Sequence, residues 1–144
     1  MSFKHALRSF LALTLALVTF AAAGAAAGQE AAPASPDVQA VTWDSWLEAK
    51  TNAEKRDAEG DYIGALQYYL EYIRQAEALN SPPRVAWGKN NAAYMIIKMY
   101  RQDPTVDLAP AKKLLEEGLA VEGATEDCRA VLAKNLEYVK SCLR

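Results

Sequence analysis

The chain has 144 residues, with 16 Lys and Arg against 18 Asp and Glu, and its formal net charge at pH 7 is −2. This length suffices for one domain. A slightly acidic chain without a basic block is a poor candidate for binding nucleic acid or an anionic membrane surface.

The N-terminal segment, residues 1–27, has the order of regions typical of a secretory signal peptide. Two basic residues, Lys4 and Arg8, precede an apolar run over residues 10–20, and small residues, mainly alanine, fill the rest. This order predicts export to the bacterial periplasm or secretion.

Cleavage is expected near Ala23 or Ala27, because each residue ends an Ala-x-Ala pattern. The alternative is an uncleaved anchor, since the uncharged run approaches the length that spans a bilayer. Its second half is Ala and Gly, however, which inserts weakly. We therefore expect no stable membrane insertion after cleavage.

Cleavage would also remove His5, the only histidine of the chain. The mature protein then contains no Ser/His or Cys/His nucleophile arrangement and no histidine metal ligand. We expect no enzyme activity, no cofactor and no metal site. An enzyme based on the carboxylate pairs Glu54/Asp57 or Asp57/Asp61 is the remaining catalytic alternative.

The segment 28–41 is rich in Ala, Pro, Ser and Gln and shows no apolar periodicity, which predicts a flexible linker. The domain is then residues 42–144. A helix over 43–59 is expected to begin after Thr42, a good N-cap residue. Its two Trp residues favour core packing or a hydrophobic lid, with a ligand site as the alternative.

A second helix follows the turn Gly60-Asp61 and ends near Leu79. Its apolar residues recur at i, i+3, i+4 and i+7, as expected for one buried face. It also carries four tyrosines, for which packing between two neighbours is favoured over a ladder that grips a peptide or sugar. The tyrosines are Tyr62, Tyr68, Tyr69 and Tyr72.

A third helix over 82–100 is apolar around most of its circumference, which predicts a central position. Ser81 is a candidate cap, and Pro82 suits the first helical position. Asn90 and Asn91 interrupt the apolar pattern. Because buried asparagine must be hydrogen-bonded, they are expected to bridge to a neighbouring helix or to face a groove.

A fourth helix is predicted over 107–121 and a fifth from the N-cap Thr125 onward. The fifth carries Cys128 and Cys142 on its apolar stripe. Fourteen helical residues rise roughly 21 Å, whereas bridged Cα atoms lie within about 7 Å. We expect two buried thiols, with a late helix break or a disulfide between chains as alternatives.

Three segments resemble the tetratricopeptide repeat (TPR) family. The segment Gly60-Asp61-Tyr62-x-x-Ala65-Leu66-x-x-Tyr69 is similar to the start of that family's second helix. Trp87-x-x-Asn90-Asn91-x-x-Tyr94 is similar to its first helix, and Asp107-Leu108-x-x-Ala111-x-x-x-Leu115 again resembles a second helix. The resemblance covers most of residues 43–144.

The resemblance implies an all-α fold in which about five antiparallel helices form two and a half helix-turn-helix repeats of a short right-handed solenoid. It also implies a peptide-binding groove on the first helices. Mapped onto this chain, the groove residues are Lys50, Glu54, Asp57, Gly88, Asn91, Ala92, Met95 and Met99. The family's carboxylate-clamping mode is not carried over, because Glu54 stands where an Asn is needed.

The main hypothesis is therefore an exported, non-catalytic interaction module, an adaptor or scaffold that binds a protein or peptide in the cell envelope. The alternative is a carrier of a small ligand or lipid in an apolar cavity between the helices, lined by Met95, Met99 and the tyrosines.

Overall fold

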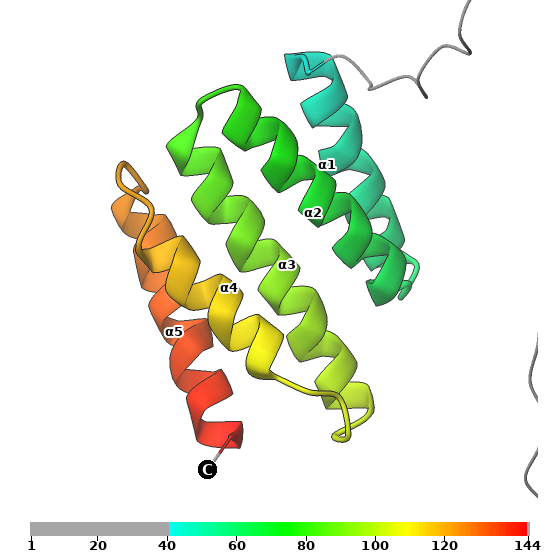
Figure 1. The fold of residues 1–144 in the computed structure, drawn as a ribbon. Coiled ribbons are helices and arrows are strands. Elements are labelled where there is room, and N and C mark those ends of the chain that lie inside the picture. Colours follow the sequence, from blue (N-terminus) through cyan, green and yellow to red (C-terminus); the bar gives the residue numbers. More distant parts are fainter. Residues whose placement is uncertain (1–40, 144) are drawn as a thin grey trace, which may run out of the picture. The chain divides into compact units, whose positions relative to one another are not determined.

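The computed structural model describes residues 41–143, which form five α-helices and, within this range, no strand (Figure 1). The helices are α1 (Trp43–Ala58), α2 (Tyr62–Ala78), α3 (Pro82–Gln102), α4 (Ala109–Leu119) and α5 (Glu126–Cys142). The expected all-α class is confirmed. The predicted signal peptide, 1–27, and almost all of the predicted linker, 28–41, lie outside the described residues.

Three of the predicted helix caps are present. The side chains of Thr42, Asp61 and Thr125 each accept a hydrogen bond from the backbone N–H three residues further on. Such a cap satisfies one of the N–H groups that a helix start leaves without an intrahelical partner. The predicted cap Ser81 is different, because it makes no side-chain cap bond to α3. Its Oγ instead accepts a hydrogen bond from Arg84 Nη1 at 3.1 Å.

The turn between α1 and α2 depends on Gly60. Its φ of 79° lies in the left-handed region, which glycine adopts without the steric cost of a Cβ. The backbone N–H of Gly60 donates to the carbonyl of Asp57, and that of Asp61 donates to the carbonyl of Arg56. The turn therefore reverses the chain within three residues, so that α2 returns along α1.

Consecutive helices pack against one another throughout the described range, and α3 also contacts α5. Figure 1 shows α3 in the middle, with α1 and α2 to one side and α4 and α5 to the other. The helix predicted to be central thus packs against α2, α4 and α5, and its Lys98 also contacts Asp57 of α1. Its nine buried residues are spread around its circumference.

The core consists of two clusters that meet at α3. The first cluster joins α1, α2 and α3 and contains five buried alanines with Tyr69, Tyr72, Ile73, Val85 and Met95. The second joins α3, α4 and α5 and is mainly aliphatic, with Ile96, Ile97, Leu108, Leu115, Leu132, Leu136 and Val139. The tyrosines Tyr69 and Tyr72 are therefore packing residues, as expected for a helix between two neighbours.

Both cysteines are free thiols. Cys128 is fully buried in the second cluster, as predicted, and burial raises the pKa of its thiol. Cys142 departs from the prediction because it is only partly buried. It is the last residue of α5 and packs at the edge of the second cluster.

Candidate interaction face on α1, α3 and α5

The three odd-numbered helices are joined by polar side chains rather than by apolar packing alone. Lys98 Nζ of α3 contacts both carboxylate oxygens of Asp57 on α1, at 2.6 and 2.8 Å. Asn135 Nδ2 of α5 donates to Asn90 Oδ1 of α3 at 2.9 Å. We call the surface that carries these contacts the odd-helix face. In Figure 1, α2 and α4 cover the opposite side of the domain.

Three of the eight predicted groove residues lie in the core instead of on this face. Ala92 and Met95 belong to the first cluster, with exposed fractions of 0 and 2%. Gly88 is also buried, and a Cβ at this position would stand 2.6 Å from the ring of Tyr72. These residues allow α2 and α3 to approach closely, so they present no surface to a ligand. Helical spacing places them beside Asn91 but cannot tell which side α2 covers.

The other five predicted residues retain exposed surface: Lys50, Glu54, Asp57, Asn91 and Met99. Lys50 and Glu54 form an ion pair at 2.5 Å one turn apart on α1. Asp57 forms an ion pair with Lys98. Two of the three carboxylates considered for an enzyme, those of Glu54 and Asp57, therefore already have a cationic partner. The third, Asp61, contacts Arg56 at 3.2 Å and caps α2.

Lys98 is enclosed on two further sides by aromatic rings. Its Nζ lies 5.3 Å from the ring centroid of Tyr62 and 5.1 Å from that of Tyr94. Cation–π contacts of this kind hold a cation in place in addition to its ion pair. The side chains of Lys98 and Asp57 are each 24% exposed. The pair is therefore a structural link between α1 and α3.

Three asparagines form a chain of hydrogen bonds across the face. Asn135 donates to Asn90, and Asn90 Nδ2 donates in turn to Asn91 Oδ1 at 3.2 Å. Asn90 is only 5% exposed, so its amide is satisfied as a buried polar group requires. The two options raised from sequence, a bridge to a neighbouring helix and a place at a groove, are both realised. We call this set the asparagine chain.

An open groove of about 410 Å³ lies beside the asparagine chain, between α3 and α5. Its lining residues are Asn90, Tyr94, Arg101, Val131, Lys134 and Asn135. None of them is acidic, and Val131 is 37% exposed, which adds an apolar contact. The groove therefore combines two cations, two amides and two apolar surfaces.

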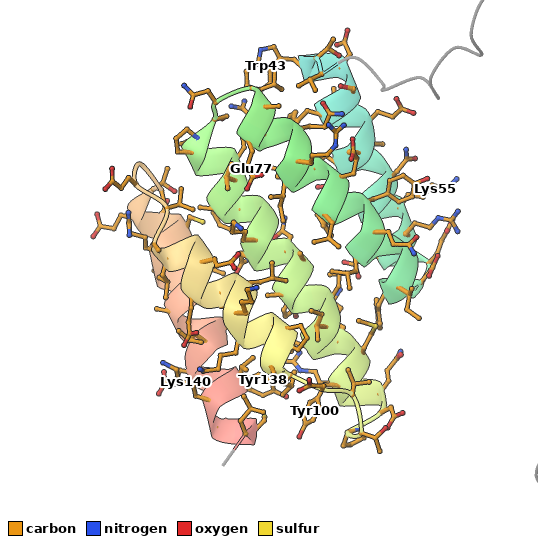
Figure 2. All side chains as sticks on the ribbon, in the orientation of Figure 1. Trp43, Lys55, Glu77, Tyr100, Tyr138 and Lys140 are labelled. Carbon is orange, nitrogen blue, oxygen red and sulfur yellow. The ribbon has the colours of Figure 1, made fainter. Side chains whose placement is uncertain are left out.

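Arg101 is held at one end of this groove by two tyrosine rings. Its guanidinium carbon lies 4.9 Å from the ring centroid of Tyr138 on α5 and 5.8 Å from that of Tyr94. Figure 2 shows Tyr138 near the C-terminal end of α3, where Tyr100 also lies. Hydrogen bonding with Tyr138, and more weakly with Tyr94, raises the pKa of Arg101 above its ordinary value.

The sequence did not single out Tyr94, Arg101, Val131, Lys134 or Asn135 as binding residues. The tertiary structure brings them together because α5 packs against α3, so polar residues of α5 lie beside those of α3. All eight predicted groove residues lie on α1 and α3, so they do not include the side of the groove that α5 forms.

Four other grooves on the described surface have volumes of about 230–330 Å³. The groove of 290 Å³ between α2 and α4 is the most apolar, with Leu66, Leu70, Ile96, Pro110 and Leu114. All five grooves open to solvent rather than lying enclosed between the helices. Within residues 41–143, no cluster of three or more His, Cys, Asp or Glu side chains has metal-binding geometry.

Comparison of the chain with protein-family models, curated proteins and solved structures finds no match. None of the five described helices is both long enough and apolar enough to cross a membrane.

Proposed function

We propose that the protein is an exported, non-catalytic interaction module of the bacterial cell envelope, built as a short right-handed TPR-like solenoid. It binds a protein or peptide segment on the odd-helix face. The observation that carries this proposal is the open α3–α5 groove with the asparagine chain beside it. The partly exposed amides of Asn91 and Asn135 next to an apolar surface suit the alternating polar and apolar groups of a peptide.

The helix packing supports the solenoid. Each helix contacts the next, and α3 contacts α5 across the intervening helix. The Asp57–Lys98 ion pair also links α1 to α3. Such a repeating relation between every second helix places successive odd helices side by side, which generates an extended face.

Site-specific photocrosslinking tests the position of the binding face. The photoreactive residue p-benzoylphenylalanine would replace Asn91 or Lys134 on the odd-helix face, and Gln67 on α2 would serve as the control site. The exported protein would be irradiated in intact cells, and adducts would be separated by mass.

We expect adducts to one defined envelope protein from positions 91 and 134 and none from position 67. Adducts from position 67 alone would place the binding surface on α2 and contradict the proposal. The absence of adducts from both odd-face positions would also contradict it.

Export has its own test, because it rests on the sequence of residues 1–27. Mass spectrometry of the protein from the cell-envelope and culture fractions should give a chain that begins at Gly24 or Gly28. Recovery of a chain that still starts at Met1, in the cytosol or in the membrane, would overturn the export proposal.

A further inference from the structure

The charges around the α3–α5 groove differ from those on the rest of the odd-helix face. On α1 and the adjoining side of α3, the two cations of the odd-helix face have carboxylate partners, Lys50 with Glu54 and Lys98 with Asp57. Within the described residues, neither Arg101 nor Lys134 has a carboxylate within ion-pair distance. The groove is thus a local positive site on a chain with a net negative charge.

Arg101 is also arranged for recognition of a planar anion. Its guanidinium is restrained between the rings of Tyr94 and Tyr138, so little side-chain freedom is left to lose when a ligand binds. A guanidinium presents N–H donors in a fork that matches the two oxygens of a carboxylate. Lys134 lines the same groove and adds a second, less directional charge.

The asparagine chain has two unused ends. Its two internal bonds leave Asn91 Nδ2 as a donor and Asn135 Oδ1 as an acceptor, and neither has a hydrogen-bond partner among the described residues. A peptide group offers one acceptor and one donor of the same kind. The chain can therefore bind the backbone of an extended segment without reading its side chains.

We infer that the α3–α5 groove binds an extended peptide segment through its acidic side chains, with Asn91 and Asn135 on its backbone and with Arg101 and Lys134 on its carboxylates. This inference rests on the proposed function and names the chemical class of the partner. The carboxylates are those of Glu or Asp side chains within the segment, so a free peptide C-terminus is not required.

The test is an NMR titration of the purified, exported protein with a defined probe. The probe is an eight-residue peptide of alternating Glu and Ala, acetylated and amidated so that it carries no terminal charge. Peptides with Gln or Lys in place of Glu are the controls. We expect the side-chain amide signals of Asn91 and Asn135 and the Nε–H signal of Arg101 to shift with the acidic probe only.

Variants separate the groove from the overall charge of the protein. The double variant R101Q/K134Q should weaken binding of the acidic probe about tenfold, since two charge contacts are lost. The control double variant K113Q/K140Q removes the same charge from exposed positions outside the groove and should change the affinity less than twofold. Circular dichroism would check that both variants keep their helical content.

The outcomes distinguish the inference from the function on which it rests. Three results would overturn the inference. They are NMR shifts spread over all surface cations, equal weakening of binding in both double variants, and no binding of the acidic probe. If crosslinking through position 91 or 134 still captures a partner in those cases, the proposed function stands and the acidic class is wrong. If neither the titration nor the crosslinking detects binding, the proposed function is wrong as well.

Discussion

The half of the domain formed by α1, α2 and α3 packs on alanine and tyrosine, whereas the half formed by α3, α4 and α5 packs on leucine, isoleucine and valine. In the first half, small residues bring the helix backbones close and flat rings fill the space beside them. In the second half, branched side chains interdigitate. The two halves should therefore lose stability in different ways. The first half should be destabilised when a side chain is enlarged, and the second half when a side chain is truncated.

The largest expected effect is truncation in the second half. Leu132→Ala removes a fully buried side chain and leaves a cavity, so we expect a loss of about 2–5 kcal/mol in the free energy of unfolding. The matched control is Leu143→Ala, because Leu143 is 48% exposed and should cost less than about 1 kcal/mol. Urea denaturation followed by circular dichroism measures both. Equal losses would mean that the second cluster is not the packed core described here.

A pair of glycine substitutions tests enlargement in both halves. A Cβ at Gly88 would lie 2.6 Å from Tyr72 and 2.7 Å from Ile73, whereas a Cβ at Gly118 would meet Leu132 Cδ2 at 2.7 Å. The methyl group of Leu132 lies at the end of a flexible side chain and can move. The ring of Tyr72 and Cγ1 of Ile73 cannot move without displacing α2.

We expect Gly88→Ala to cost about 1–3 kcal/mol of unfolding free energy. Gly118→Ala should be nearly neutral, because helix propensity offsets the contact by up to about 1 kcal/mol. Thermal denaturation would rank the two variants. A greater loss for Gly118→Ala would reverse the comparison between the halves.

The aromatic packing of the first half should also make it sensitive to alkaline pH. Burial, chiefly, raises the pKa of Tyr69 and of Tyr72 from 10.0 to about 12. A tyrosine whose pKa is higher in the folded state than in the unfolded state favours folding. This contribution to stability is present in full below about pH 10. That contribution is then lost as the pH rises from about 10 to about 12.

At pH 11 the loss should be about 1 kcal/mol for each of the two tyrosines. Urea denaturation between pH 8 and pH 11 measures it, and Tyr69→Phe should remove one tyrosine's share of the slope. An unchanged slope in that variant would show that another group controls alkaline unfolding.

The smallest expected effect compares one ion pair from each half. Lys98–Asp57 joins α1 to α3 through two short contacts, and both side chains are 24% exposed. Lys89–Glu117 joins α3 to α4 through one contact of 2.8 Å, and Glu117 is 40% exposed. We expect double-mutant cycles to give coupling energies of about 1 and about 0.3 kcal/mol, in that order. A stronger coupling for Lys89–Glu117 would contradict the link assigned to Lys98.

The sequence alone determined the helices and most of their boundaries. Apolar residues at helical spacing, the caps Thr42, Asp61 and Thr125, and the glycine turn at Gly60 are local features, so they can be read without knowing what each helix touches. Ser81 shows the limit of such reading, because its hydroxyl had a competing partner in Arg84.

Only the tertiary structure decided which residues of a helix face solvent. Gly88, Ala92 and Met95 have the spacing of groove residues but are covered by α2, whereas Asn90 is buried and still belongs to the groove through its bond to Asn135. The positive site on Arg101 and Lys134 also depends on α5 lying beside α3. A helix has neighbours on several sides, and periodicity states which residues share a side but not which neighbour lies there.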